Sequence, residues 1–280
     1  MSSITSVSHE PELIAKATAG DREAFAQLYE AVERPLASFL YRLIGLRQVA
    51  EDLAQETVLR ALETIGAFSG VTSFRVWLFR MAVEAGFERL QGETPWSPDL
   101  QVRFGQRLAE NDALRRRVRK THGLGVRATY DIAEHIDYCF MCLGRTLPPH
   151  ESAALLLAQV YGFSHEETGE VLGAPAETIR SRVEQARQTL VEQLESRCSL
   201  INTKGSCGLC AGYHTLLYGD QRQTERALFE INLQARFTPQ ERAATWDQRL
   251  AIVRSIDPLH AEGTRFHESL MTITLEKSHS

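Results

Sequence analysis

Apolar residues along this chain recur mainly at the spacing of a helix, in segments that glycines separate. Near the N-terminus the pattern predicts a helix around Leu13 and a second one that Asp21 caps. Further helices are predicted over Pro35–Ile44, Val49–Ile65 and Phe74–Leu90. Chain reversals between these helices are marked by Gly45, Gly66 and Gly70. We find no convincing strand pattern and no repeat, so the sequence predicts an all-α fold.

The same pattern divides the chain into helical domains. We predict a first helical domain over residues 10–91, a linker with one basic helix over 92–128, a second helical domain over 129–197, a cysteine-rich segment over 198–214 and a helical C-terminal extension over 215–280. In the extension, Trp246, Leu250 and Val253 share one side of a predicted helix. The fold is therefore expected to consist of two helical domains joined by a linker, plus this extension.

The segment Tyr161–Leu190 has the layout of a helix-turn-helix, with an acidic helix, a turn at Gly173-Ala174-Pro175 and a second helix that carries arginines. In such motifs the second helix enters a DNA major groove. Its predicted buried stripe is Ile179, Val183, Ala186 and Leu190. An ordinary helical hairpin with a solvated face is the alternative interpretation.

The outer face of this second helix carries the candidate DNA contacts. Arg180, Ser181 and Glu184 fall where base edges are read, and Arg182 and Arg187 are better placed for phosphates. The full candidate set is Glu177, Thr178, Arg180, Ser181, Arg182, Glu184 and Arg187.

Composition and charge narrow the class of protein. The chain has 280 residues, of which 43% are hydrophobic and 24% charged, as in globular proteins, and a net charge of −5. A negative chain does not coat DNA nonspecifically, although a local basic patch still permits binding. Apolar runs are shorter than the ~20 residues of a membrane span, and the N-terminus lacks a secretory signal, so we expect a cytoplasmic protein without a membrane partner. Without a phosphate-binding glycine loop, a nucleophile elbow or an HExxH motif, an enzyme is not expected.

Three further blocks accompany the helix-turn-helix: AGDREAFAQLYE over 19–30, VAEDLAQETVLRAL over 49–62 and AFSGVTSFRVWLFRMA over 67–82. Together with Leu147-Pro148 and the helix-turn-helix, they resemble the extracytoplasmic-function (ECF) group of bacterial RNA polymerase sigma factors. The resemblance covers about residues 13–90 and 131–194. It implies a first domain that shapes and reads the melted promoter −10 element, and a last domain that reads the −35 element.

The resemblance also assigns roles to residues. Contacts with the clamp helices of the polymerase largest subunit fall on Asp52, Gln55, Glu56 and Arg60. Reading of the −10 element falls on the loop from Phe68 to Phe74 and on Arg75, Trp77 and Arg80. Stacking of an unpaired base on an aromatic ring contributes about 1–3 kcal/mol, and a plain core anchor is the alternative role for Trp77. RNA polymerase core, promoter DNA and an anti-sigma factor are the implied partners.

The chain departs from the family pattern in two places. After Trp77 the family usually continues with a basic residue and an asparagine, whereas this chain has Val83 and Glu84. Fewer cations favour either weak promoter melting or a narrow promoter set. In the helix-turn-helix, Gly169 stands where the family favours alanine, and Pro175 replaces a serine cap.

The cysteines suggest a metal. Cys139-x-x-Cys142 and Cys207-Gly-Leu-Cys210 each have the spacing of half a zinc site, and Cys198 is the fifth cysteine. Zinc takes four ligands, so four of these five cysteines would bind a structural Zn²⁺, with Cys207 and Cys210 the safest choices. A redox-responsive thiol pair and inert buried thiols are the alternatives.

We therefore predict a sigma factor that binds core RNA polymerase and directs initiation at specific promoters. A helix-turn-helix regulator without productive polymerase engagement is one alternative. A zinc- or redox-responsive protein-interaction module is another. The C-terminal extension is expected to modulate promoter use.

Overall fold

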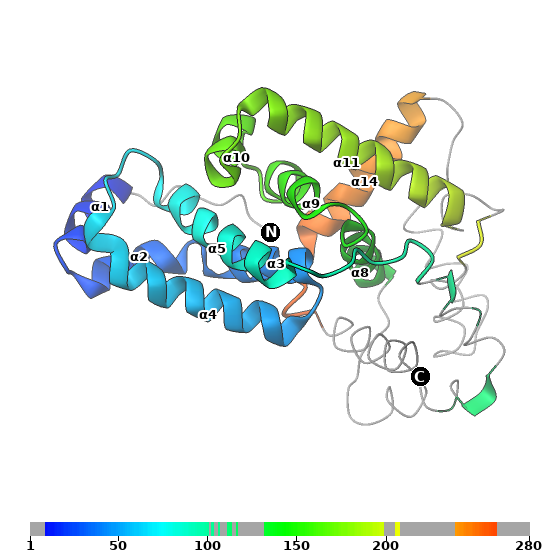
Figure 1. Ribbon diagram of the computed structural model, residues 1–280, viewed down its shortest axis with the longest axis horizontal. Coiled ribbons are helices and arrows are strands. Elements are labelled where there is room, and N and C mark those ends of the chain that lie inside the picture. Colours follow the sequence, from blue (N-terminus) through cyan, green and yellow to red (C-terminus); the bar gives the residue numbers. More distant parts are fainter. Residues whose placement is uncertain are drawn as a thin grey trace. The chain divides into compact units, whose positions relative to one another are not determined.

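A computed structural model describes residues 9–100, 132–198, 205–207 and 239–261, with isolated positions between 102 and 116 (Figure 1). Within these residues the chain is helical and forms no strand apart from one isolated bridge between Cys198 and Cys207. The prediction of an all-α fold is confirmed.

The chain folds into two compact units, each of which is discontinuous in sequence. The first takes in Met1–Pro95 and Leu147–Arg187, and the second takes in Trp96–Thr146 and Gln188–Ser280. These units do not follow the order of the predicted domains, whose boundaries stay predictions.

The first unit contains most of the helices. They are α1 (Glu10–Thr18), α2 (Arg22–Glu30), α3 (Glu33–Ile44), α4 (Arg47–Thr64), the short 3₁₀ helix η1 (Ile65–Ala67), α5 (Phe74–Leu90), α9 (Pro149–Leu155), the π-helical turn η2 (Leu156–Val160), α10 (His165–Leu172) and most of α11 (Ala176–Arg197). The second unit contains α8 (Ile132–Gly144), the end of α11 and α14 (Pro239–Ser255).

The core of the first unit is built around α3, which lies against both α4 and α5 (Figure 1). Leu36, Phe39 and Leu40 of α3 are fully buried, and the Phe39 ring lies 5.4 Å from that of Phe79 on α5. On α4 the buried side chains are small: Ala50, Ala54, Thr57 and Ala61. Because these recur at helical spacing and have little bulk, α3 and α4 can pack closely. The opposite face of α4 is left for solvent.

Local sequence signals set most helix ends. Asp21 caps α2, because its carboxylate accepts hydrogen bonds from the backbone N–H groups of Glu23 and Ala24 at 2.9 and 3.2 Å. Gly45 ends α3 in a left-handed conformation with φ of 83°. Both signals confirm the prediction. Gly66, in contrast, lies inside η1 instead of in an open reversal.

Helix boundaries also agree closely with the sequence pattern. α5 spans Phe74–Leu90 as predicted, and α4 begins two residues before the predicted Val49. α3 begins at Glu33 instead of Pro35, because proline is tolerated in the first helical turn.

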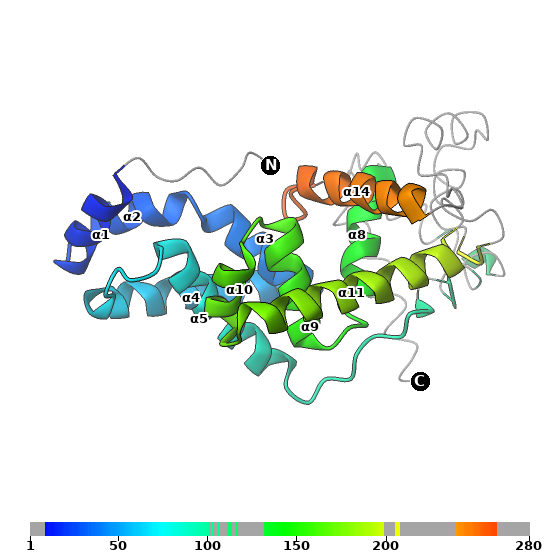
Figure 2. The same cartoon turned by 90° about the horizontal axis from the view of Figure 1, so that it is seen from above.

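In the second unit, α8 packs against α14 (Figure 2). The rings of Phe140 and Trp246 lie 5.9 Å apart, and Trp246, Leu250 and Val253 are buried, as their shared side predicted. Of the helices predicted beyond residue 215, α14 lies within the described residues. Most of the predicted basic helix in the linker lies outside them.

Candidate nucleic-acid interface

The helix-turn-helix forms as predicted from α10, a turn and α11. Ser164 and Glu167 form a capping box at the start of α10, with hydrogen bonds of 2.8 and 3.0 Å between each side chain and the other residue's backbone N–H. Gly173 ends the helix with a φ of 63°, which L side chains rarely adopt. These local devices fix where α10 begins and ends, and thus where α11 starts.

Gly169 has a steric role in this turn. The backbone N–H of Ala174 donates to the Gly169 carbonyl at 3.0 Å, and a Cβ added to Gly169 would lie 2.5 Å from the carbonyl oxygen of Ala174. The alanine that the family favours therefore does not fit here without a shift of the turn backbone.

The two faces of α11 are separated as the sequence predicted. Ile179, Val183, Ala186 and Leu190 are buried, which confirms the predicted stripe. Glu177, Arg180, Ser181 and Glu184 are exposed, while Thr178, Arg182 and Arg187 are partly buried.

Two arginines of the predicted reading face pair with glutamates one helical turn before them. Arg180 Nη1 lies 2.6 Å from Glu177 Oε2. Arg187 binds the Glu184 carboxylate through two hydrogen bonds of 2.6 and 2.8 Å. The Arg180–Glu177 pair is solvent-exposed, and such pairs contribute little to stability. DNA can therefore replace Glu177 as the partner of Arg180 at low cost in free energy.

Arg182 lies close to the start of α9 instead of standing free. The pKa of His150 is lowered, chiefly by burial and to a smaller extent by the positive charge of Arg182. Burial raises the pKa of Glu151, and Arg182 opposes that effect. The His150 ring also contacts the Phe87 ring, with centroids 4.3 Å apart. Arg182 thus acts electrostatically on the first turn of α9.

The predicted polymerase contacts share one face of α4. Asp52, Gln55, Glu56 and Arg60 are all exposed, and Leu59 among them is 61% exposed. Arg60 lies 3.5 Å from Glu84 of α5. Glu84 stands near the place where the family pattern has cations. Arg60 of the neighbouring helix partly balances its negative charge.

The aromatic residues predicted to read the −10 element form a cluster. Phe68 and Phe74 are buried, and Trp77 is partly buried. The ring of Trp77 lies 4.8 Å from that of Phe68 and 5.8 Å from that of Phe74. In this arrangement Phe68 and Phe74 support the loop from beneath, and Trp77 is the ring of the three that reaches the surface.

The two arginines predicted to contact −10 DNA bind the helix-turn-helix segment in this structure. The Arg75 guanidinium lies 3.6 Å from the centroid of the Phe163 ring, and its Nη2 donates to the Tyr161 carbonyl at 3.3 Å. Arg80 donates two hydrogen bonds, of 2.7 and 3.0 Å, to the Glu170 carbonyl. Accordingly, α10 packs against α5.

The contact between Arg42 and Tyr161 was not predicted from the sequence. Arg42 of α3 is fully buried and donates a 2.6 Å hydrogen bond to the Tyr161 hydroxyl. Tyr161 follows the π-helical turn, and its ring also contacts Phe39 at 5.8 Å. No local pattern signals this pair, because 119 residues separate its members.

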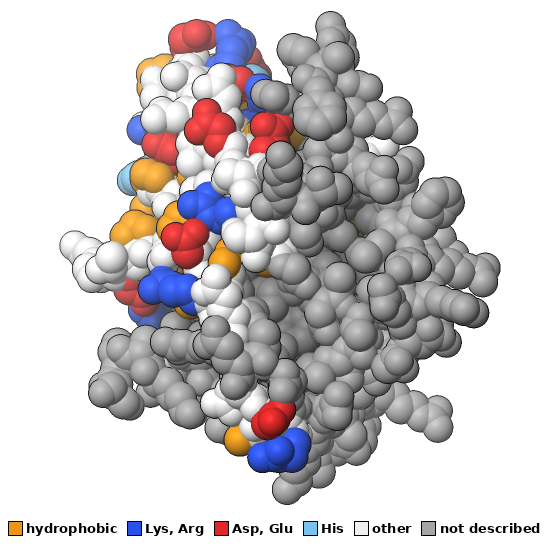
Figure 3. All heavy atoms as spheres, turned by 90° about the vertical axis from the view of Figure 1, so that its right-hand side faces the viewer, with side chains coloured by type: hydrophobic (Ala, Val, Ile, Leu, Met, Phe, Trp, Pro, Cys, Tyr) orange, Lys and Arg blue, Asp and Glu red, His pale blue; other side chains and the backbone are white. Residues whose placement is uncertain are grey.

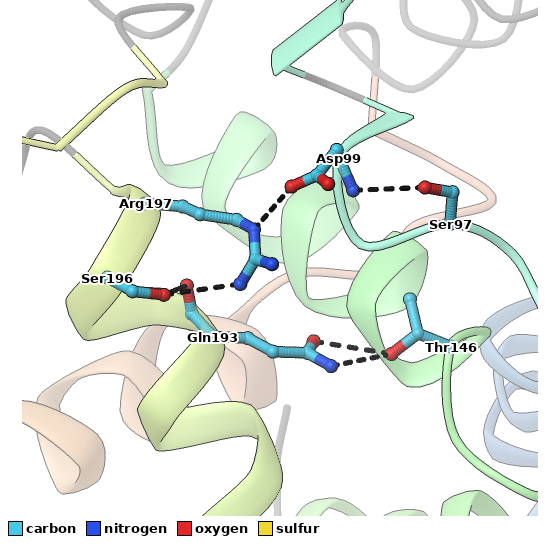
Figure 4. A network of polar contacts seen from close by, with 6 residues as sticks. All are labelled: Ser97, Asp99, Thr146, Gln193, Ser196 and Arg197. Atoms are coloured by element: carbon cyan, nitrogen blue, oxygen red, sulfur yellow. Dashed lines mark hydrogen bonds and ion pairs between the residues drawn. The ribbon is translucent and has the colours of Figure 1, made fainter.

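The C-terminal end of α11 is held by polar contacts within the second unit (Figure 4). Arg197 Nε lies 2.7 Å from Asp99 Oδ1, and the Gln193 side-chain amide is 3.2 Å from the Thr146 hydroxyl. These contacts fix the end of the helix at the point where the cysteine-rich segment begins.

The predicted metal ligands are described in part. Cys139 and Cys142 lie on α8, and Cys198 follows α11. The backbones of Cys198 and Cys207 form a β-bridge. None of these four cysteines forms a disulfide. Cys210 lies outside the described residues. Among those described, no three His, Cys, Asp or Glu side chains already stand at the spacing of a metal site.

On the face shown in Figure 3, the described Lys and Arg side chains are interspersed with Asp and Glu. Such a mixture differs from the single-sign surface of proteins that coat DNA.

Among the helices that the structure describes, none combines the length and apolar character that crossing a bilayer requires.

Comparison with known families agrees with this geometry. Residues 28–93 match the model of Sigma-70 region 2, and residues 138–190 match that of Sigma-70 region 4. The first match contains α3, α4 and α5, and the second contains α9, α10 and much of α11.

Curated relatives align with most of their own length. The chain is 25% identical over 188 residues to the RNA polymerase sigma-H factor of Pseudomonas aeruginosa, covering 66% of this chain and 94% of that protein. It is 25% identical over 185 residues to the ECF RNA polymerase sigma-E factor of Escherichia coli K12, covering 65% and 93%. A similar solved structure is that of CnrH in complex with the cytosolic domain of CnrY, with 20% identity, a TM-score of 0.48 and coverage of 66% and 97%.

Proposed function

Given that this chain belongs to the sigma-70 family, in its extracytoplasmic-function group, we propose that α4 binds the polymerase and that α5 and α11 read the promoter. The protein is a non-enzymatic subunit that binds RNA polymerase and promoter DNA and directs transcription initiation. The observation that carries the assignment of surfaces is that the outer faces of α4 and α11 are exposed, while their opposite faces form the core.

For the polymerase, we propose the α4 face of Asp52, Gln55, Glu56 and Arg60. Its mixture of charged and amide groups around the exposed Leu59 fits a protein partner, because interfaces commonly combine an apolar contact with a polar rim. Pull-down with core polymerase tests this. Gln55→Ala should weaken binding about tenfold, or ~1.4 kcal/mol, whereas the matched control Glu30→Ala, at an exposed position of α2, should leave it unchanged. Equal binding by both variants would remove the assignment.

For the −35 element, we propose that Arg180, Ser181 and Glu184 contact bases and that Arg182 and Arg187 contact phosphates. Gel-shift assays at several salt concentrations separate the two kinds of contact. Arg180→Ala should cost about 1–3 kcal/mol of discrimination against a mutated promoter. Arg187→Ala should weaken binding to all sequences and reduce the salt dependence. Unchanged promoter binding by Arg180→Ala would show that the recognition face is wrongly assigned.

For the −10 element, we propose that Arg75 and Arg80 exchange their contacts with the helix-turn-helix segment for promoter DNA, next to Trp77. Their present acceptors are backbone carbonyls of Tyr161 and Glu170, which are uncharged. A phosphate or an unpaired base offers a guanidinium a charged or stacking partner in exchange. Permanganate footprinting of the polymerase complex tests this: Arg80→Ala should reduce strand opening while −35 binding is retained. Full strand opening by both Arg75→Ala and Arg80→Ala would contradict it.

We also propose an anti-sigma factor as a partner and the cytoplasm as the location, where polymerase and promoters are found. This class of partner is one that the resemblance to the ECF sigma factors implies. Affinity purification of the full chain from its own cells, followed by mass spectrometry, should recover a stoichiometric protein besides polymerase. Recovery of polymerase alone would remove the anti-sigma proposal and leave the polymerase assignment intact.

The extension beyond residue 215 is proposed to modulate promoter use. Trp246 of α14 is buried and its ring lies 5.9 Å from that of Phe140 on α8, so this helix of the extension packs within the second unit. Transcription by a chain truncated after Tyr213 tests the proposal. Unchanged activity and solubility would remove it.

A further inference from the structure

The loop over residues 68–74, which the family resemblance assigns to the −10 element, runs alongside α1. Where the loop begins, α1 packs against η1, and a Cβ added to Gly66 would lie 3.9 Å from the Thr18 carbonyl oxygen. Near the tip of the loop, a Cβ added to Gly70 would lie 3.8 Å from Ile14 Cγ2. Both are ordinary van der Waals distances, so the loop follows the helix closely without a steric clash.

The end of the loop is held by a hydrogen bond from outside α5. Phe74 is the first residue of α5, so its backbone N–H has no acceptor within the helix. The Ser73 side chain accepts instead from the Val76 N–H, at 3.2 Å. Glu10 Oε1 is the acceptor for the Phe74 N–H, at 3.1 Å, across 64 residues of sequence. A carboxylate in this place is also favoured by the dipole of α5.

The three contacts come from one face of α1, since the helix residues that make them stand about one turn apart. The chain opposite advances by the same interval in the reverse direction. The pairs are Glu10 with Phe74, Ile14 with Gly70 and Thr18 with Gly66. The match to Sigma-70 region 2 starts at residue 28, so α1 lies outside it. The family model therefore gives no role to this helix.

Between its two ends the loop is open to solvent. Val71, near the tip, is 87% exposed although it is apolar, and Trp77 in the first turn of α5 is partly buried. A loop that is already held in place loses less conformational freedom when it binds, and the binding free energy is then more favourable. A hydrogen bond at the end of this loop can therefore affect DNA binding without touching DNA.

We propose that Glu10 is a positioning residue for the −10 element, which holds the loop through the Phe74 N–H and so presents Val71 and Trp77 to unpaired bases. This inference rests on the proposed role of the loop and concerns what holds it. Glu10 acts through the loop instead of contacting DNA, because a carboxylate and a phosphate repel each other.

Amide hydrogen exchange of the full chain, without DNA, tests the hydrogen bond. Glu10→Ala should speed exchange of the Phe74 N–H about 3- to 10-fold. Glu10→Gln keeps an acceptor oxygen and should restore most of the protection. Glu12→Ala is the matched control, because this carboxylate binds Lys16 at 2.7 Å within α1, and it should change nothing. Equal exchange in the wild type and Glu10→Ala would overturn the proposal.

Competition between promoters with an intact and a substituted −10 element, bound by the polymerase complex, tests the consequence. Glu10→Ala should lower the preference for the intact element about 3- to 10-fold, with unchanged affinity for the −35 element. Glu10→Gln and Glu12→Ala should keep the preference. Since Glu10→Gln removes the charge that acts on Arg75, it separates the hydrogen bond from that electrostatic effect. Equal losses at both elements in Glu10→Ala would indicate general destabilisation and overturn the positioning role.

Val71→Asp and Trp77→Ala report on the loop itself in the same competition. If they lose the −10 preference while Glu10→Ala keeps it, the positioning role is wrong and the role of the loop stands. If both keep the preference, the loop does not read the −10 element, and the proposed function of this surface is wrong together with the role of Glu10.

Discussion

The guanidinium of Arg75 lies over the face of the Phe163 ring, 3.6 Å from its centroid. This contact joins α5 to the start of the helix-turn-helix segment, just before α10. Burial lowers the pKa of Arg75, and Glu167 and Glu10 oppose that effect. The residue remains charged, so the ring faces a partly desolvated cation, for which the attraction is strongest.

The Arg75–Phe163 pair should stabilise the first unit measurably. A double-mutant cycle of Arg75→Ala and Phe163→Leu, followed by urea unfolding, should give a coupling energy of about 0.5–2 kcal/mol. Additive effects of the two substitutions would show that the contact contributes nothing to the folded state.

Gly169→Ala should destabilise the helix-turn-helix, although alanine has the higher helix propensity by about 1 kcal/mol. The added Cβ would lie 2.5 Å from the Ala174 carbonyl oxygen, which belongs to the turn backbone and cannot move without disturbing α11. We expect a net loss of about 1–3 kcal/mol in the free energy of unfolding.

Gly86→Ala is the matched control for this substitution. Its Cβ would meet Leu43 Cδ2 at 2.9 Å, the end of a flexible side chain that can rotate away. Thermal unfolding of both variants should therefore show the larger loss at Gly169. A stabilised Gly169→Ala protein would contradict the steric account.

Tyr161→Phe should destabilise the first unit by about 1–3 kcal/mol, because it removes a hydrogen bond from a fully buried guanidinium. Urea unfolding measures the loss. Tyr29→Phe, at a partly buried tyrosine whose pKa burial raises to about 12, is the comparison. Equal effects of the two substitutions would show that the bond to Arg42 has no special weight.

Stability should fall as the pH drops through 6.5, the ordinary pKa of histidine. Burial and, to a lesser extent, Arg182 lower the pKa of His150, so the unfolded chain binds a proton at a higher pH than the folded chain. The free energy of unfolding therefore decreases from about pH 7.5 downward until the folded-state pKa is passed.

His150→Gln should remove this part of the pH dependence, as urea unfolding across the same pH series would show. The raised pKa of Glu151 gives an opposite slope above pH 4.5, but it is present in both proteins and cancels in the comparison. An identical slope in the variant would mean that His150 does not titrate differently on folding.

Much of the fold could be predicted because its signals are local. The spacing of Ile179, Val183, Ala186 and Leu190 identified the buried stripe of α11, and the bounds of α5 followed from periodicity alone. The capping box of Ser164 and Glu167 was equally readable, as a serine followed three residues later by a glutamate, but was missed. The candidate sites were predictable only as exposed faces of helices.

What the sequence determined, then, are the helices, their caps and their inner and outer faces, since each depends on residues within a few turns of one another. The tertiary structure decided the partners of Arg75 and Arg80, the steric need for Gly169, and the pairing of Cys198 with Cys207. Each of these depends on groups that lie apart in the sequence or on a backbone path through a turn. Such contacts leave no periodic trace along the chain.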